Sequence, residues 1–111
     1  MTEVDKVLSL LSMARRAGEL LIGQDKIFDA IRRKKKLVVL VTEDCSANVM
    51  RTLNAAAERG DIKIFKIEGT ERTALGERIG TASAQAAALP EQSGFSARII
   101  SMIKDRSDAD E

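Results

Sequence analysis

The stretch LLIGQDKIFDAIRRKKKLVVLVTED, residues 20–44, contains a strand, a helix and a second strand in close succession, and it predicts the fold class. Residues 19–22 form a short apolar run that predicts a strand, and Gly23 marks the turn that follows. The apolar residues after Gly23 recur at helical spacing up to a run of basic residues. Residues 36–43 are then mostly apolar and β-branched, as in a central strand that helices cover on both faces.

The alternation of helix and strand continues to both ends of the chain. Thr2 and Asp5 predict a capping box for the first helix, and Ser46 and Thr70 are expected to cap later helices. This alternation predicts one α/β domain in which a sheet lies between helical layers. We expect helices over residues 3–16, from 46 to the stop at Gly60, from 70 to near Gly80 and over 94–104, and further strands over residues 62–67 and over 84–89, ending before Pro90.

The composition excludes several kinds of catalytic site. The 111 residues include no His, so a Ser/His/Asp triad, a Cys/His pair and an imidazole metal site cannot form in this chain. Cys45 is the single cysteine and follows an apolar run, which predicts a packed thiol in a reducing compartment. No pattern places a carboxylate and a lysine together in a cleft. We therefore expect no catalytic residue, no metal and no cofactor, and predict that the chain is not an enzyme.

The apolar segments give no sign of export or of a membrane anchor. The first apolar residues are interrupted at helical spacing, and the longest apolar run, Leu37 to Val41, is far too short to cross a bilayer. We expect a cytoplasmic protein with no membrane partner that is a monomer when free. Residues 1–105 are predicted to form the domain, and the acidic residues 106–111 a frayed tail.

The basic run Arg32 to Lys36 has two interpretations. Cations in the last turn of a helix complement its dipole, and solvated charge runs are common. Residues 15–36, however, hold eight basic residues against three acidic ones, in a chain whose net charge is only +1. Such a concentration of positive charge is typical of nucleic-acid binding that depends strongly on salt.

The aromatic residues narrow the kind of nucleic acid. Trp and Tyr are absent, and Phe28, Phe65 and Phe95 fall on inward-facing positions, which leaves no platform for stacking the bases of a single strand. The helix that starts after Gly23 would offer backbone N–H groups to a phosphate or a base edge. The segment lacks the further glycines and the lysine of a P-loop. These observations favour structured RNA, recognised by its shape and its phosphates.

Four segments resemble one known family in their order and spacing. They are RAG at residues 16–18, the turn at Gly23, KLVVLVTED at residues 36–44 and LGERIG at residues 75–80. Over roughly residues 5–105 the chain resembles the ribosomal-protein family of kink-turn RNA binders, the L7Ae/L30e/Gadd superfamily, and most closely its bacterial YlxQ branch. The resemblance implies a three-layer α/β/α sandwich with a small mixed four-stranded sheet.

The resemblance also implies where RNA would bind. The family's signature at the start of the second helix is Gly-x-Asn-Glu-x-x-Lys. Gly23 matches it, whereas Asp25, Lys26 and Asp29 stand at the Asn, Glu and Lys positions. Asp25 can accept hydrogen bonds from base N–H groups, and Lys26 can contact a phosphate in place of the family's lysine.

The family's second contact loop corresponds to residues 81–83, which could equally be an ordinary connecting loop. We predict a non-catalytic protein that binds structured RNA, either ribosomal RNA or another kinked RNA, as a ribosomal or ribosome-associated protein. The alternative is a protein-interaction module of the same fold that has lost kink-turn recognition. The predicted RNA-binding residues are Gly23, Gln24, Asp25 and Lys26 at the bases and the kinked backbone, Arg32, Arg33 and Lys36 at phosphates, and Thr81, Ala82 and Ser83 in the second loop.

Overall fold

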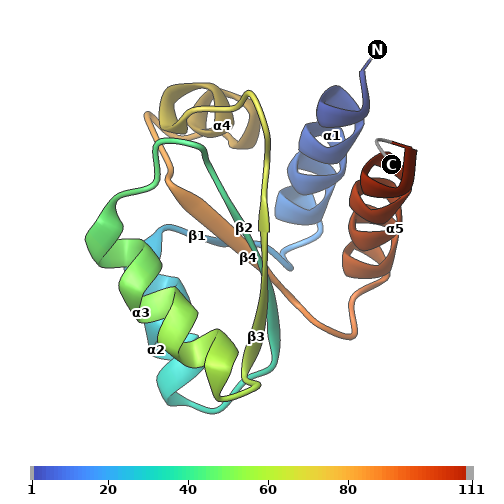
Figure 1. Cartoon of the computed structure of the whole chain (residues 1–111). Helices are drawn as coiled ribbons and strands as arrows, with labels where there is room; N and C mark the ends of the chain where they lie inside the picture. Colours follow the sequence, from blue (N-terminus) through green and yellow to red (C-terminus); the bar gives the residue numbers. More distant parts are fainter. Residues whose placement is uncertain (1, 110–111) are drawn as a thin grey trace.

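The structure is a computed structural model that describes residues 2–109, and the side chains of residues 2–103. Within that range five helices and four strands alternate along the chain (Figure 1). The helices are α1 (Glu3–Arg16), α2 (Gln24–Arg32), α3 (Ala47–Glu58), α4 (Arg72–Ile79) and α5 (Gly94–Ala109). The strands are β1 (Leu21–Ile22), β2 (Leu37–Val41), β3 (Ile62–Lys66) and β4 (Ala86–Pro90).

The strands form one mixed sheet in the order β1-β4-β2-β3. β2 and β3 are parallel, and the chain crosses from one to the other through α3, as parallel neighbours require. β4 runs antiparallel to both β1 and β2. Val39 at the centre of β2 stands opposite Ile64 of β3 and Ala88 of β4. The predicted small mixed sheet of four strands is therefore confirmed.

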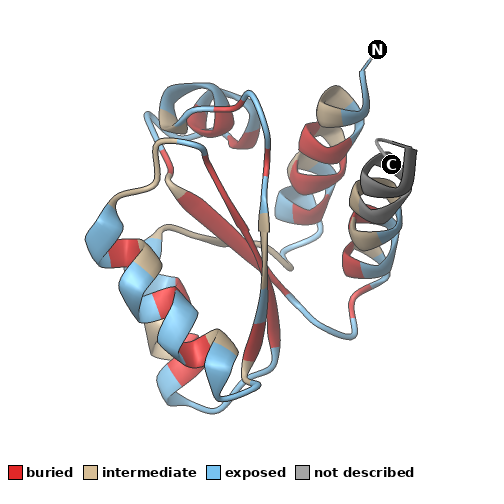
Figure 2. Cartoon of the chain, viewed as in Figure 1, coloured by how far each residue is buried: buried red, intermediate tan, exposed pale blue. Residues whose placement is uncertain are grey.

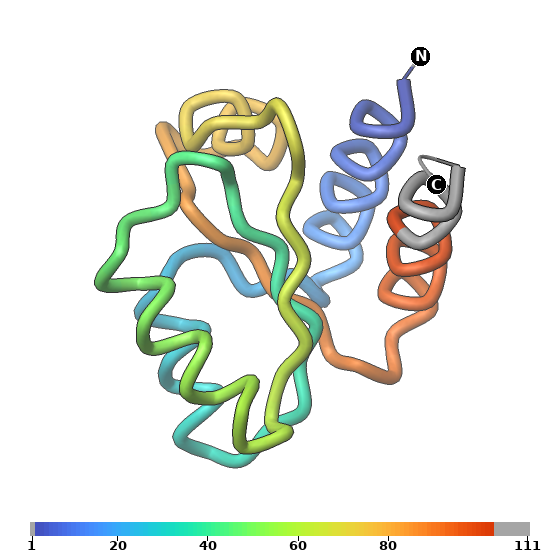
Figure 3. Tube along the Cα trace, in the orientation of Figure 1, coloured from blue at the N-terminus to red at the C-terminus, as the bar shows by residue number. Residues whose placement is uncertain are grey.

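Helices cover both faces of the sheet and so form the outer layers. α2 and α3 lie on one face, and α1 and α5 lie side by side on the other, with α4 against α1 near one end of the sheet (Figures 1 and 3). Buried residues line the sheet, whereas the outer sides of the helices are exposed (Figure 2). Every residue of β2 is buried, with at most 2% of its surface exposed, which confirms the predicted central strand.

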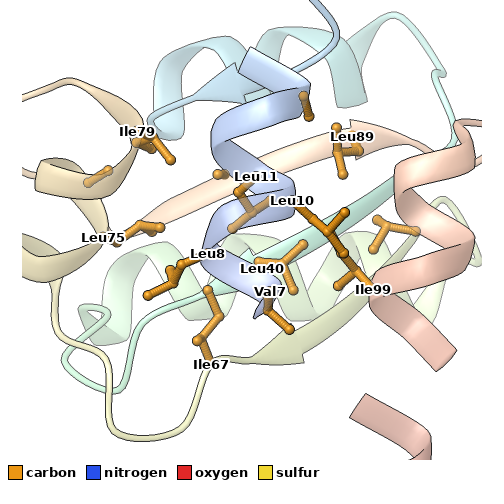
Figure 4. Close-up of a cluster of buried hydrophobic side chains, with 14 residues drawn as sticks. Val7, Leu8, Leu10, Leu11, Leu40, Ile67, Leu75, Ile79, Leu89 and Ile99 are labelled. Carbon is orange, nitrogen blue, oxygen red and sulfur yellow. The ribbon is translucent and has the colours of Figure 1, made fainter. Parts of the chain in front are cut away.

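One core lies between the sheet and the layer of α1 and α5 (Figure 4). Leu11 of α1, Leu40 of β2 and Ile99 of α5 are fully buried in it. Leu75 and Ile79 bring α4 into the same cluster. Burial of these aliphatic side chains stabilises the position of α4, and with it the position of the loop that follows α4.

A second core lies between the sheet and the layer of α2 and α3. Ile27 of α2 and Leu53 of α3 have no exposed surface and belong to one cluster with Val39. Phe28 packs against this cluster, and the other two aromatic residues of the chain, Phe65 and Phe95, pack against the first core. The three rings are therefore used in packing, as predicted.

The start of α4 differs from the predicted Thr70 cap. Thr70 is only 2% exposed, and its carbonyl oxygen accepts a hydrogen bond from the Glu43 N–H at 2.9 Å. The N-cap residue is Glu71, and its side chain makes no capping hydrogen bond. The Asp44 carboxylate instead accepts a hydrogen bond from the Arg72 N–H at 2.9 Å. The cap is thus supplied by a residue that is distant along the chain.

Two element ends also differ from the prediction. β4 runs through Pro90, which stands opposite Leu37 where the ladder with β2 ends, so the missing N–H removes no inner ladder bond. α5 continues to Ala109, past the expected end at residue 104 and into the segment 106–111 that was predicted to be a tail. Residues 110 and 111 of that segment lie outside the described residues.

Candidate nucleic-acid interface

Gly23 turns the chain from β1 into α2. Its φ of 90° and ψ of 157° lie in a region that is essentially restricted to glycine. Its N–H donates a hydrogen bond to the Ala86 carbonyl oxygen at 3.1 Å, which ties the turn to β4. No side chain in the described part of the chain caps α2. The backbone N–H groups of the first turn of α2 can therefore bind an acceptor from outside.

Gln24, Asp25 and Lys26 form this first turn, and all three are exposed. Asp25 carries a carboxylate that can only accept hydrogen bonds when ionised, and its charge complements the helix dipole. Lys26 adds an ammonium group with three donors one residue further on. Base donor groups and a phosphate can thus be bound within a single helical turn.

The pairing of β1 with β4 brings the loop at residues 81–83 to the same end of the sheet. Ile22 stands opposite Ala87, so the residues that precede β4 lie beside the turn at Gly23. The three loop residues, Thr81, Ala82 and Ser83, are exposed. The structure therefore brings together the helix start and the loop that the sequence suggested separately.

This loop folds back closely on α4. The Thr81 N–H donates to the Gly76 carbonyl oxygen at 2.8 Å, and the Ala84 N–H donates to the Arg72 carbonyl oxygen at 3.0 Å. A Cβ atom at residue 76 would lie only 2.6 Å from the Ser83 Cα. The glycine at position 76 is thus what allows the loop to approach the helix.

Arg15 brings a cation to the same loop. Gly80 ends α4 with a φ of 85°, and a Cβ there would lie 2.9 Å from Nη1 of Arg15. The Arg15 side chain therefore lies over the residue that precedes Thr81. The sequence analysis counted Arg15 only in the local charge, because nothing in the sequence shows that the ends of α1 and α4 lie side by side.

Asp44 and Gln85 fix the segments around this end of the sheet. The Gln85 side-chain oxygen accepts a hydrogen bond from the Ser46 N–H at 2.6 Å, and Asp44 accepts from Nε of Arg72 at 3.1 Å. Hydrogen bonding by the Thr42 side chain, and then by Arg72, holds the pKa of Asp44 below its ordinary value. The carboxylate that positions α4 is therefore ionised at neutral pH.

The structure does not bring Arg32, Arg33 and Lys36 to the turn at Gly23. They follow or end the 9-residue helix α2, whose start is the turn. A rise of 1.5 Å per residue places the two ends of such a helix roughly 12 Å apart. The ten predicted residues are thus divided between two ends of the molecule, seven at the Gly23 end and three at the other.

The three distant cations have acidic neighbours. Arg32 and Arg33 lie 3.6 Å and 3.0 Å from the carboxylate of Asp29. Lys36 lies 3.7 Å from the carboxylate of Asp61, and its Nζ also donates to the Gly60 carbonyl oxygen at 3.1 Å. All of these cations remain more than half exposed, so the pairs are weak and leave the charges accessible.

Other candidate chemistry is limited in the described part of the chain. It holds no group of three His, Cys, Asp or Glu residues that could bind a metal ion. None of the helices described is long and apolar enough to cross a membrane. Cys45 is half-buried and packs against the core under α2 and α3, as predicted, and burial raises the pKa of its thiol.

The fold and this end of the sheet define a class of small α/β/α domains that present a helix start and a neighbouring loop to a ligand. The chain belongs to the ribosomal protein L7Ae/L30e/S12e/Gadd45 family, whose family model matches residues 5–100. It is similar to the RNA-binding protein YlxQ of Bacillus subtilis (strain 168), with 31% identity over 94 residues, which are 85% of this chain and 91% of the relative. These two findings confirm the family and its YlxQ-like branch.

Two solved structures share the fold. A protein of unknown function from Bacillus halodurans has a TM-score of 0.77 and 25% identity, and the match covers 89% of this chain and 97% of that one. The 15.5 kD RNA binding protein of Giardia lamblia has a TM-score of 0.67 and 16% identity, with 98% and 91% of the chains covered. The second similarity is evidence for the fold alone.

Proposed function

We propose that this chain is a non-catalytic protein that binds kinked, structured RNA through the end of the sheet where Gly23 and the loop Thr81–Ser83 lie together. The observation that carries the proposal is this juxtaposition, which the β1–β4 pairing produces in a member of a ribosomal-protein family. The similar protein of Bacillus subtilis is an RNA-binding protein, which supports the same class of ligand. A ribosomal RNA, or another RNA with a kink, is the ligand we propose, with the protein acting in the cytoplasm on or near the ribosome.

The two segments have complementary roles in this proposal. The first turn of α2 offers backbone N–H groups, the Asp25 carboxylate accepts from base donors, and Lys26 contacts a phosphate. The loop at residues 81–83 has small side chains, so a bent RNA backbone can approach it closely. Arg15 beside Gly80 supplies a second cation for that backbone. An RNA must bend to touch both segments, and this gives selectivity for shape.

A binding titration tests the ligand class. The protein is titrated with a kink-turn RNA and with a straight duplex of equal length, each at two salt concentrations. We expect tighter binding of the kinked RNA at both, because only its shape reaches both segments. Equal binding of the two RNAs with a steep salt dependence would reduce the interaction to non-specific charge. Absence of binding to either RNA would favour the protein-interaction alternative.

A substitution at the turn tests the place of the site. Gly23→Val adds a side chain into open space, since a Cβ there meets no protein atom within 4 Å, so the fold bears only the backbone strain. That strain costs about 1–3 kcal/mol, and the valine would block the approach of RNA. Gly69→Val is the matched control, because Gly69 also has a positive φ, of 71°, and open space, but follows β3 at the other side of the sheet. A folded Gly23→Val variant with full affinity for RNA would place the site elsewhere.

A further inference from the structure

Six basic residues surround the end of the molecule opposite to the turn at Gly23. They lie where α2 ends, where β2 begins and where α3 ends. The Lys36 carbonyl oxygen accepts from the Glu91 N–H at 3.0 Å, and the Leu37 N–H donates to Asp61, so these segments are held together. We refer to this surface as the distal basic end, which consists of Arg32, Arg33, Lys34, Lys35, Lys36 and Arg59.

Lys34 occupies a backbone conformation that favours glycine. Its φ is 64°, and among the described residues it is the only non-glycine residue with a positive φ. The Lys34 and Lys35 N–H groups close the end of α2 by donating to the Ile31 and Ala30 carbonyl oxygens. A lysine in this left-handed position lowers the stability of the fold relative to glycine.

The same chain ends two other helices with this turn and uses glycine in both. At the end of α1 the residue is Gly18, with a φ of 78°, and at the end of α3 it is Gly60, with a φ of 81°. The hydrogen bonds match those of α2, with Glu19 N–H donating to Ala14 and Asp61 N–H donating to Ala56. α2 alone among these three places a cation where glycine is more stable. A contribution of the Lys34 charge to binding would explain this.

The charges of the distal basic end are accessible. Lys34 and Lys35 are exposed, and among the described residues neither has a hydrogen-bonding or ionic partner for its side chain. The other four cations pair with only two carboxylates, those of Asp29 and Asp61, in exposed contacts. This surface therefore keeps an excess of positive charge, with the two lysines as its most available members.

The surroundings favour a phosphate backbone over a protein as the partner. Protein interfaces rely on buried aromatic and aliphatic anchors. Among the described residues the one large hydrophobic side chain that is exposed is Met13, which lies on α1 in the opposite layer. The distal basic end offers cations without such an anchor, as surfaces that follow a nucleic-acid backbone do.

We propose that the distal basic end is a second RNA-contact surface, which binds the phosphates of the duplex that flanks the RNA segment held at Gly23. This inference rests on the proposed function. Since α2 joins the two surfaces over only about 12 Å, a single RNA helix that leaves the turn along α2 reaches both. The first surface recognises the kink, and the second extends the contact without reading sequence.

The test compares two kink-turn RNAs, one with a minimal flanking stem and one with a stem extended by a full helical turn. The unaltered protein is expected to bind the extended RNA several-fold more tightly. In the variant Lys34→Gly/Lys35→Gln that gain should disappear, and the salt dependence for the extended RNA should fall by about two contacts. Binding of the minimal RNA should stay the same. Lys34→Gly alone should raise Tm by about 3 °C, because glycine relieves the backbone strain.

A charge-matched control separates site from net charge. Lys6→Gln/Arg98→Gln removes two exposed cations from α1 and α5, in the layer that does not contain α2. This control should keep the gain for the extended RNA. The inference is overturned if the minimal RNA binds but the extended stem adds nothing, or if both double variants lose the gain equally. If neither RNA binds at all, the proposed function fails, and the inference fails with it.

Discussion

A Cβ atom on Gly76 of α4 would lie 2.6 Å from the Cα of Ser83 and 2.8 Å from its backbone nitrogen. The loop and the helix are thus packed backbone against backbone. The hydrogen bond from the Thr81 N–H to the Gly76 carbonyl oxygen, at 2.8 Å, holds the first residue of the loop in the same place. The position of the second proposed contact loop is therefore set by α4, and not by the loop sequence alone.

Gly76→Ala is predicted to displace this loop. Because the new methyl group meets backbone atoms that cannot rotate away, the free energy of unfolding should fall by about 1–3 kcal/mol. The affinity for kinked RNA should fall as well, since residues 81–83 move. Urea unfolding and an RNA titration measure the two effects. Gly94→Ala is the control, because a Cβ there meets no atom within 4 Å, and we expect a change within about 1 kcal/mol. Retention of full stability by Gly76→Ala would contradict the packing described.

Arg15→Gln is predicted to weaken the binding of kinked RNA without unfolding the protein. The guanidinium lies over Gly80 beside the loop and is exposed, so its loss should remove one phosphate contact. The slope of log affinity against log salt concentration should fall by about one. Arg51→Gln removes an exposed charge from α3 whose side chain donates to Asn48 at 3.2 Å, and it should have a smaller effect. Equal losses in the two variants would show that only total charge matters.

Stability is predicted to fall in acid. Hydrogen bonds from the backbone and then the side chain of Thr2, followed by the charge of Arg78, hold the pKa of Asp5 below its ordinary value of 3.8. The folded state therefore binds this proton less readily than the unfolded state. The contribution is present above the unfolded pKa and is lost as the pH falls through the lower, folded pKa. Asp44 has a shift of the same sign. Thermal unfolding from pH 7 to pH 2 should show Tm declining below about pH 4.

Asp5→Asn should lower Tm at pH 7 and make the acid decline shallower. The substitution weakens the capping box of α1 and the contact with Arg78, which holds α1 to α4 at 3.5 Å. Asp25→Asn is the comparison, since Asp25 is exposed and the structure gives it no ion pair within the described residues. A steeper acid decline in Asp5→Asn than in the unaltered protein would refute the assigned sign.

Cys45 is predicted to react slowly with alkylating reagents. Burial against the core under α2 and α3 raises the pKa of the thiol, so little thiolate is present at neutral pH. At pH 8 the rate with iodoacetamide should be well below that of free cysteine and should rise to that rate in urea. A native rate equal to that of free cysteine would mean that the segment between β2 and α3 opens readily.

The fold was predictable wherever a local pattern decides it. The apolar, β-branched run of β2 and the capping box of Thr2 and Asp5 identify their elements because the relevant contacts are close in sequence. The start of α4 was not predictable, since its cap is the carboxylate of Asp44, which reaches Arg72 only through the packing of two loops. Pro90 was misjudged because pairing with Leu37 at the end of the ladder tolerates it.

The candidate site shows the same division. Gly23 could be singled out because a turn between a strand and a helix requires its conformation. Its closeness to residues 81–83 follows from the antiparallel pairing of β1 with β4, which residue spacing does not reveal. The count of basic residues joined Arg33 to Lys26, although α2 holds them apart. A tally along the sequence ignores the length of the helix between two charges.

The two outermost strands have a consequence for assembly. β1 has only two residues, and β3 exposes Lys63 and Lys66, the first of which pairs with Glu91 at 3.1 Å. Exposed strand edges invite another polypeptide to extend a sheet, and short edges and lysines oppose this. Two copies of this chain should therefore not join through their sheets. A chain protected in this way can accumulate to high concentration as separate molecules, each with its loops and helix ends free to find a ligand.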